Sequence, residues 1–263
     1  MNVDRAVPGR RPSRNPLERV FAKHIAKGTV TRTSLVTPTM KSIRIHCPEL
    51  NERPHEPGQH VRVEINDPLS LYGILRPIET LRTYTIWEHS PASEEFELRA
   101  HLYEGDGIGL KWARDVKAGD PVKFWGPMGD FTTQPAPYHL FVGEETATVA
   151  FGPMIRALGP DAQVFAVLES ETEEDEVPLP GEPNASHRIH RVHRNGASAV
   201  SSERMLAGMA KLELPGNAGT AYVAGEARTC RLVRDHLVRE HNWPRQSIKI
   251  KPFWTPDKRG LHH

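Results

Sequence analysis

The sequence predicts a two-domain fold, with an antiparallel β-barrel over residues 21–137 and an α/β domain with a parallel sheet over residues 138–263. The first observation behind this prediction is a run of short extended segments, separated by turn residues, between about 27 and 129. The second is a change after Pro137, where strand-like segments begin to alternate with helical ones. A chain of 263 residues is long enough for two modest domains of this kind.

The barrel strands are indicated by β-branched and aromatic residues with partial alternation. The segments of this kind are VTRTSLV, KSIRIHC, HVRVEIN, RTYTIW, FELRAHLY and DPVKFWG. Turn residues separate them at Thr37 and Pro38, at Pro57 and Gly58, and in the GDG turn at 105–107. So many short strands in about 100 residues are typical of an antiparallel barrel. After the GDG turn, a short helix is expected at 111–115.

The second domain is predicted from buried strands that run into polar loops. Its strand-like segments are HLFVGEE, QVFAVLESE, AYVAGEA and IKIKPFW. One helix, with Ser201 or Ser202 at its start, covers SSERMLAGMAKLEL. A second covers ARTCRLVRDHLVREH, where Cys230, Val233 and Leu237 share one face. Strands that alternate with helices form a parallel sheet, in which ligands bind at the carboxyl ends of the strands.

The charge and hydropathy of the chain argue against two classes of partner. The formal net charge of +1 provides no overall attraction to nucleic acid or an anionic membrane. No apolar run approaches the roughly 18 residues that span a bilayer. Residues 1–20 lack the apolar stretch of a secretory signal and are expected to form a disordered tail. Cys47 and Cys230 lack metal-ligand spacing, which fits a reducing compartment, so we expect a cytoplasmic protein. We also expect it to be a monomer.

Two polar segments of the second domain need an interpretation. The acidic stretch ESETEEDE, at 169–176, is expected to be an exposed loop, because it lacks the spaced partners of a metal site. The segment HRIHRVHR, at 187–194, carries histidines at steps of three, but Pro183, Ile189 and Val192 favour an extended conformation. A metal role is disfavoured there because the neighbouring arginines would repel a cation.

The segment Arg82-Thr83-Tyr84-Thr85 carries groups that suit a flavin dinucleotide. On a strand, alternation places Arg82 and Tyr84 on one side and Thr85 on the other. A guanidinium can pair with pyrophosphate, a tyrosine ring can cover the flavin rings, and a hydroxyl or amide can reach flavin N5. The helix start that follows offers free N–H groups for a diphosphate. The order of these elements, rather than the RTYT segment alone, favours a flavin site.

In their order along the chain, several blocks resemble the siderophore-interacting proteins, a branch of the ferredoxin–NADP reductase superfamily. The resemblance covers about 28–260, nearly the whole chain apart from the tail. Its blocks are TPTMKSIRI, PGQHVRVEI, RTYTIW, GDGIGLKWA, KAGDPVKFWGP, VGEETATVA, VAGEA and the closing KPFW…RG. It implies that 21–137 is an FAD-binding barrel and that 138–263 binds NADPH or NADH.

The resemblance also assigns roles to individual residues. The expected cofactor-binding residues of the barrel are Arg82, Thr83, Tyr84, Thr85, Leu102, Tyr103, Gly109, Leu110, Lys111 and Trp112. In the second domain, Glu145 and Thr146 would lie beside the nicotinamide pocket. Gly225 and Glu226 would lie on the cofactor-facing loop of a later strand.

Three positions depart from the pattern of the family. Tyr103 stands where relatives usually carry a histidine, and Glu144 replaces the usual aspartate of G-D-E-T-A. Leu110 lies in the stretch where relatives have G-P-A-S, so the serine hydroxyl is missing. Backbone amides or Lys111 would then have to serve as the phosphate donors.

The reaction implied by the resemblance is reduction of a ferric siderophore. Fe³⁺ is held by hard oxygen ligands far more tightly than Fe²⁺, so reduction releases the metal. A flavin joins a two-electron donor to a one-electron acceptor, and no acid–base residue is required. Lys251, Lys258 and Arg259 are the expected contacts for an anionic ferric siderophore, because the C-terminal segment should return to the domain junction.

The choice between NADPH and NADH is left open by the sequence. Arg228 and Arg231 would suit a 2′-phosphate, whereas the acidic stretch from Glu169 would suit a ribose. The two arginines slightly favour NADPH. Two other functions remain as alternatives. One is a flavin reductase that serves an iron–sulfur protein or an oxygenase, and the other is a non-catalytic module that has lost FAD.

Overall fold

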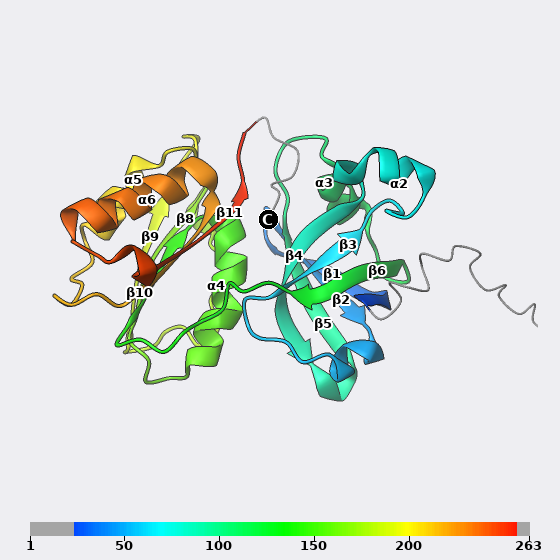
Figure 1. Cartoon of the computed structure of the whole chain (residues 1–263), viewed down its shortest axis with the longest axis horizontal. Coiled ribbons are helices and arrows are strands. Elements are labelled where there is room, and N and C mark those ends of the chain that lie inside the picture. The colour runs from blue at the N-terminus through cyan, green and yellow to red at the C-terminus, as the bar shows by residue number, and fades with distance from the viewer. Residues whose placement is uncertain (1–23, 257–263) are drawn as a thin grey trace, which may run out of the picture.

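A computed structural model describes residues 24–256. In Figure 1 the barrel lies on the right and the sheet with its helices on the left. The expected tail at 1–20 lies outside the described residues, as do Lys258 and Arg259. Among the helices of residues 24–256, none has the length and apolar character needed to cross a bilayer.

The first domain is a closed antiparallel barrel, as the sequence predicts. Its strands are β1 (Ile25–Thr37), β2 (Met40–His46), β3 (His60–Glu64), β4 (Leu81–Ser90), β5 (Glu95–His101) and β6 (Pro121–Met128). They pair in the order β1-β2-β5-β4-β3-β6, and β6 pairs with β1 to close the barrel. Inward-facing residues form one core, in which the rings of Phe96 and Phe124 meet edge to face with centroids 5.0 Å apart.

Two short helices lie in the connections of the barrel. Helix α3 (Ile108–Asp115) begins earlier than the expected 111–115, because the N–H of Lys111 already donates to the carbonyl of Gly107. Helix α2 (Leu71–Leu75) was not expected from the sequence. Ser70 supports its first turn, since the Ser70 hydroxyl accepts from the N–H of Gly73 at 3.0 Å.

The second domain contains a parallel sheet. Its strands are β7 (His139–Gly143), β8 (Val164–Ser170), β9 (His187–His193), β10 (Thr220–Glu226) and β11 (Ile248–Trp254). They lie in the order β11-β10-β7-β8-β9, so the chain reverses its direction of progress across the sheet between β7 and β10. The predicted strands are confirmed, and the segment 187–194 is extended as expected.

Helices cover both faces of this sheet. Helix α4 (Glu145–Leu158) lies between the sheet and the barrel, whereas α5 (Glu203–Met209) and α6 (Ala227–Glu240) cover the opposite face (Figure 1). Alternation along β7 explains the two layers, because Phe141 packs on the α4 side while Leu140 and Val142 pack on the α5–α6 side. Ser202 caps α5, as one of the two sequence expectations had it.

The expectation of an exposed loop at 169–176 is wrong for most of the segment. Glu169 and Ser170 form the end of β8, and both are buried. Asp175 is also buried, and it accepts a hydrogen bond from the Thr39 hydroxyl of the barrel at 2.7 Å. Only Glu173 and Glu174 of this stretch are exposed. Charged composition predicted a solvated loop, but the buried acids have polar partners that lie far away in the sequence.

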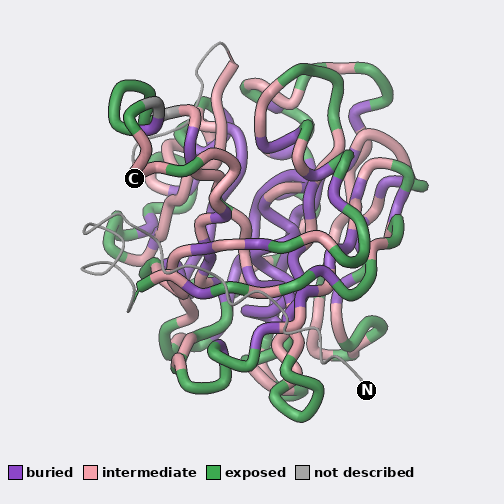
Figure 2. The backbone as a smooth tube through the Cα atoms, turned by 90° about the vertical axis from the view of Figure 1, so that its right-hand side faces the viewer, coloured by how far each residue is buried: buried purple, intermediate pink, exposed green. Residues whose placement is uncertain are grey.

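The two domains share a packed junction. Gly152 of α4 lies directly on Trp87 of β4, and a Cβ at Gly152 would come within 2.2 Å of the indole ring. The guanidinium of Arg99 covers the Trp87 ring, with its central carbon 3.5 Å from the ring centroid. Figure 2 shows buried stretches of the backbone running through the middle of the molecule, with exposed residues gathered in the outer loops. The site described below lies on elements that this junction holds together.

Candidate functional site

The flavin-side residues gather where β4 meets the start of α3. The hydroxyl of Tyr84 donates to the carbonyl of Gly109 at 2.9 Å, and its ring centroid lies 5.1 Å from that of Trp112. A Cβ at Gly109 would lie 2.7 Å from Cγ of Arg82 and 3.2 Å from the Tyr84 hydroxyl. Strand and helix therefore form a cradle that requires glycine at this position. Burial raises the pKa of Tyr84, so its hydroxyl remains a neutral hydrogen-bond donor.

The start of α3 presents backbone donors next to Arg82. The N–H groups of Ile108, Gly109 and Leu110 precede the first hydrogen bond of the helix. The N-cap residue is Gly107, which has no side chain to occupy them. Such N–H groups, together with the positive end of the helix dipole, favour an anion. The residues present therefore fit the diphosphate of a dinucleotide cofactor.

Leu110 and Lys111, two of the expected cofactor-binding residues, lie in the first half of α3. Leu110 is buried, so it can offer only its backbone N–H to a ligand. Lys111 forms an ion pair with Asp115 at 2.7 Å, and the hydrogen bond from Lys111 lowers the pKa of that carboxyl. Backbone amides and Arg82 lie at the start of α3, and the replacement of the missing serine hydroxyl by them or by Lys111 remains a prediction.

The remaining barrel residues of the expected site line the same end of the domain. Thr83 and Thr85 follow Arg82 on β4, where Thr83 is exposed and Thr85 is half-buried. Leu102 packs against the barrel core. The side chain of Tyr103 is exposed, and its ring centroid lies 6.0 Å from that of His101. Their contacts with a flavin remain a prediction.

The second half of the site lies at the carboxyl ends of β7, β10 and β11. Glu144 caps α4, since its carboxylate accepts from the N–H and the hydroxyl of Thr146 at 2.7 and 2.5 Å. The indole N–H of Trp254 donates to the same carboxylate at 3.0 Å. Gly225 has a φ of +107°, and a Cβ there would lie 2.4 Å from Oε1 of Glu144. Burial, followed by the charge of Glu145, raises the pKa of Glu144.

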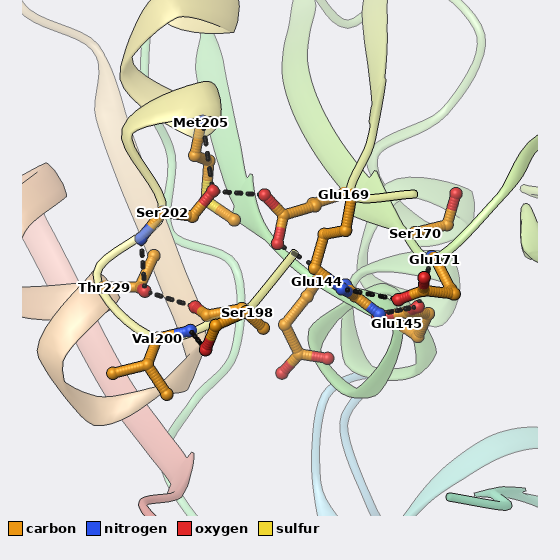
Figure 3. Close-up of polar contacts among 12 residues, drawn as sticks. Glu144, Glu145, Glu169, Ser170, Glu171, Ser198, Val200, Ser202, Met205 and Thr229 are labelled. Carbon is orange, nitrogen blue, oxygen red and sulfur yellow. Dashed lines mark hydrogen bonds and ion pairs between the residues drawn. The ribbon is translucent and has the colours of Figure 1, made fainter. Parts of the chain in front are cut away.

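The side chain of Glu145 is held in a buried ion pair. Its carboxylate makes a bidentate ion pair with Arg194, at 2.8 and 2.5 Å. The same guanidinium contacts Glu169 at 3.4 Å and Glu171 at 3.2 Å, and Ser202 donates its hydroxyl to Glu169 (Figure 3). The Glu145 side chain is therefore part of a buried polar network, and the place of Glu145 and Thr146 beside the nicotinamide remains a prediction.

Glu226 ends β10 and caps α6. Its Oε2 accepts from the backbone N–H groups of Arg228 and Thr229 at 2.9 and 2.8 Å. Its Oε1 is buried and has no hydrogen-bond partner within residues 24–256. An acceptor of this kind is costly unless a donor reaches it. Glu226 therefore offers an unused oxygen at the carboxyl edge of the sheet.

The two halves of the site meet across the domain junction. The helix that Glu144 caps packs on the barrel, since Gly152 of α4 lies directly on Trp87 of β4. His101, at the end of β5, lowers the pKa of Glu144, against the larger effect of burial. Because the ring of Tyr103 lies beside His101, the end of β5 links the flavin-side residues to the start of α4. The arrangement offers one ligand site on the barrel and a second at the carboxyl edge of the sheet.

The expected substrate residues are only partly described. Lys251 lies half-buried on β11, in register with Ala224 of β10. Lys258 and Arg259 lie outside the described residues. The grouping of these three cations therefore remains a prediction.

Sequence reasoning missed Arg194, His101 and Trp254 as members of this region. Arg194 closes a run of alternating basic residues, which gave no sign that its side chain would be 8% exposed. Its position directly after a parallel strand was the available signal, because such positions face the ligand edge of the sheet.

Comparison with known families identifies both domains. Residues 29–131 match the model of the siderophore-interacting FAD-binding domain, and residues 136–257 match that of the siderophore-interacting protein. The chain belongs to the siderophore-interacting protein family. Its barrel is thus the FAD-binding domain of this family, in agreement with the cradle at Gly109.

Curated relatives of this siderophore-interacting protein include a transporter and a reductase. The mycobactin import ATP-binding/permease protein IrtA of Mycolicibacterium smegmatis is 28% identical over 242 residues, which cover 90% of this chain and 26% of the relative. The ferric vibriobactin reductase ViuB of Vibrio cholerae is 24% identical over 265 residues, covering 94% and 93%. The chain spans about a quarter of the length of the first curated relatives that it matches.

Solved structures of related proteins share the fold. A siderophore utilization protein from T. fusca superposes with a TM-score of 0.77 at 21% identity, covering 91% of this chain and 95% of the other. A ferredoxin NADP+ reductase from Neisseria gonorrhoeae, with bound FAD and NADP, gives 0.67 at 13% identity over 88% and 99%. These siderophore-interacting and ferredoxin reductase structures show the common architecture of barrel and parallel sheet.

Proposed function

We propose that this protein is an FAD-dependent NAD(P)H:ferric-siderophore reductase that releases iron as Fe(II) in the cytoplasm. The observation that carries the proposal is the meeting of two ligand-binding halves at one junction. Arg82 lies against the start of α3 on the barrel, and Glu144 lies at the carboxyl ends of the sheet strands. The helix that Glu144 caps joins these halves, because Gly152 of α4 lies directly on Trp87 of β4, the strand that carries Arg82.

The barrel side would hold FAD through few but well-placed groups. Arg82 and the first N–H groups of α3 would bind the diphosphate, and Tyr84 would fix the cradle through its hydrogen bond to Gly109. FAD, when bound, accepts two electrons from a nicotinamide coenzyme and passes them on one at a time. The protein then has to position the donor and acceptor and to exclude water, which a packed junction favours.

The balance of the reaction follows from the two redox partners. NAD(P)H gives up a hydride, which carries two electrons, and each Fe³⁺ accepts one. One coenzyme therefore reduces two ferric siderophores and yields two Fe²⁺, one NAD(P)⁺ and one proton. Support for the ferric siderophore comes from the family and from ViuB, whose name describes a ferric vibriobactin reductase. Lys251, with Lys258 and Arg259, would attract an anionic iron complex.

Support for a cytoplasmic location comes from the cysteines. The chain contains only Cys47 and Cys230, and both are buried free thiols. Free thiols are typical of a reducing compartment. We propose that the protein acts there as a monomer, without nucleic acid or a membrane-spanning segment.

An alternative is a flavin reductase for another electron acceptor. The fold neighbours include a ferredoxin reductase of carbazole 1,9a-dioxygenase, with a TM-score of 0.66 at 16% identity over 87% of this chain and 68% of that chain. The two cysteines of this sequence cannot supply the four ligands of a cysteine-bound iron–sulfur cluster. A fused or partner ferredoxin would therefore have to supply the cluster. A module that has lost FAD is the remaining alternative.

The visible spectrum of the purified protein, supplied with FAD, separates these functions. We expect flavin bands that bleach under anaerobic addition of NADH or NADPH and return when a ferric siderophore is added. Bands that return only with a ferredoxin or an oxygenase would favour the second reductase. A protein that retains no flavin in excess FAD would be the non-catalytic module.

A further inference from the structure

The order of the strands in the sheet indicates where the adenosine half of a dinucleotide would bind. Dinucleotides lie outside the carboxyl ends of the strands, at the point where the strand order reverses, here between β7 and β10. In such sheets a nearby acidic residue accepts a hydrogen bond from the ribose 2′-hydroxyl of NADH, whereas an arginine accommodates the 2′-phosphate of NADPH. The ends of β8 and β9, the second and third strands of the domain, therefore decide the coenzyme.

The one arginine at these strand ends is already occupied. Arg194 follows β9, and its side chain is only 8% exposed. Its Nη1 and Nη2 bind Glu145, its Nη1 also contacts Glu169, and its Nε binds Glu171. Burial alone would lower the pKa of Arg194. The hydrogen bond and the negative charge of Glu145 outweigh this effect, so the pKa of Arg194 is raised. This guanidinium is thus fixed inside the network and is not available to a phosphate.

The most accessible acid of the network is Glu171, which is half-buried. The side chain of Glu171 is 37% exposed, whereas those of Glu145 and Glu169 are 2% and 0% exposed. Glu171 accepts from the N–H of Gly196 at 2.5 Å and from Arg194, and a carboxylate has acceptor sites for further donors. A ribose hydroxyl can therefore bind Glu171, whereas a phosphate would be repelled by it.

A second observation places a ligand at this edge of the sheet. Glu226, at the end of β10, is 1% exposed, and its Oε1 has no hydrogen-bond partner within the described part of the chain. A hydroxyl or amide donor of a dinucleotide would satisfy it. β10 and β8 flank β7, so Glu226 and Glu171 lie on strands about 10 Å apart at the same edge.

Unpaired cations occur instead at the outer edge of the sheet. A cavity of about 320 Å³ beside β9 is lined by residues that include His190, Arg204 and Lys211. Neither Arg204 nor Lys211 forms an ion pair within residues 24–256. β9 is the edge strand, so this cavity lies farther from the reversal between β7 and β10 than Glu171 does. It is the rival position for a 2′-phosphate and provides a control.

We propose that the protein selects NADH over NADPH and that Glu171 is the residue that discriminates between them. The proposal rests on the proposed function, because it requires a nicotinamide dinucleotide as the electron donor. It departs from the slight preference for NADPH that Arg228 and Arg231 indicated in the sequence. Both of those arginines lie on the exposed face of α6.

The test combines a rate with a binding measurement. For the FAD-loaded protein, anaerobic flavin reduction is measured with NADH and NADPH, and the affinities for ADP-ribose and 2′-phospho-ADP-ribose are measured by calorimetry. We expect a preference of about tenfold or more for NADH and for the ligand without the phosphate. Glu171→Gln should bring two ratios closer to one: the rate with NADH over that with NADPH, and the affinity for ADP-ribose over that for 2′-phospho-ADP-ribose. Glu174→Gln, which removes an exposed charge from the same segment, should change neither ratio.

Each other outcome has a definite reading. A preference for NADPH overturns the proposal. If Arg204→Ala then abolishes that preference, the 2′-phosphate binds in the cavity beside β9. Equal ratios in Glu171→Gln and the parent protein overturn the role of Glu171. If neither coenzyme reduces the flavin but ADP-ribose still binds better than 2′-phospho-ADP-ribose, the proposed reductase function is wrong and the proposed selectivity is supported. If neither ligand binds, the selectivity fails as well.

Discussion

The indole N–H of Trp254 donates a hydrogen bond to Oε1 of Glu144 across 3.0 Å, and so joins the last strand of the sheet to the start of α4. The two residues are 110 positions apart in the chain. Glu144 also caps α4 and lies against Gly225, which allows no side chain there. One carboxylate therefore aligns the ends of three elements at the ligand edge of the sheet.

Replacement of Glu144 should destabilise the protein. Glu144→Ala removes an N-cap and the acceptor of the Trp254 indole, so we expect the free energy of unfolding to fall by about 2 kcal/mol. Glu144→Gln keeps an acceptor oxygen and should lose less. Urea unfolding measures both variants, with Trp254→Phe as the control for the indole bond alone. A Glu144→Ala protein as stable as the parent would contradict this role.

The same carboxylate should make stability depend on pH. Burial and the charge of Glu145 raise the pKa of Glu144 above its ordinary 4.5, so the folded protein holds this proton more tightly than the unfolded chain. The resulting stabilisation is fully present below about pH 4.5 and is lost as the pH rises through the raised pKa. The difference in unfolding free energy between the parent and Glu144→Gln should therefore shift in favour of Gln from pH 4 toward neutral. A difference independent of pH would contradict the raised pKa.

Gly109 separates cofactor binding from stability. A Cβ at this position would displace the Arg82 side chain, so Gly109→Ala should weaken FAD binding by about tenfold, or about 1.4 kcal/mol. Alanine is the better helix former, by about 1 kcal/mol, which offsets part of the cost of moving Arg82, so the stability of the apoprotein should change less than the FAD affinity. FAD affinity by fluorescence and thermal unfolding of the apoprotein measure the two effects. Gly216→Ala, with open space around the new Cβ, is the control and should leave FAD affinity unchanged.

The buried arginine should be far more important for stability than a surface one. Arg194→Met leaves Glu145 and Glu169 buried without their cation, so we expect a loss of about 3–5 kcal/mol. Arg234→Met breaks a partly exposed pair with Asp235 and should cost less than about 1 kcal/mol. Equal losses in the two variants, measured by denaturant unfolding, would show that the network around Arg194 contributes little.

The barrel and sheet were predictable from the sequence because local composition decides such strands. β-branched and aromatic runs gave every strand of the barrel, and helix periodicity gave the buried face of α6 through Cys230, Val233 and Leu237. The first turn of α3 was missed because Gly107 and Gly109 are weak helix formers. Its helical start depends on packing against Arg82, which no local pattern contains.

The residues of the site were predictable only where they belong to a recognisable short motif. Arg82 and Tyr84 meet Gly109 as the order of the segments indicated, whereas the partner of Glu145 could not be foreseen. Arg194 lies 49 positions further along the chain, in a basic run whose composition indicated exposure. The pairing of buried charges that are far apart in the chain depends on which strands are neighbours in the sheet. No single segment of the sequence predicts that strand order.

The basic C-terminal residues should govern the affinity for an anionic substrate. Replacement of Lys251, Lys258 and Arg259 by alanine should raise the KM for an anionic ferric siderophore by about tenfold at low salt, because three attractive charges are lost. Added salt should reduce this difference, since it screens the charges. Lys117→Ala, in an exposed turn of the barrel, is the control. An unchanged KM in the triple variant would remove these residues from the substrate site.

The most direct test of the reductase is the stoichiometry of iron release. The FAD-loaded protein is mixed anaerobically with NADH, an excess of ferric siderophore and a coloured Fe²⁺ chelator, and both coenzyme oxidation and the ferrous complex are followed. Because a hydride carries two electrons, we expect two Fe²⁺ for each coenzyme oxidised. Coenzyme oxidation without Fe²⁺, with NADPH as well as NADH, would contradict a ferric-siderophore reductase.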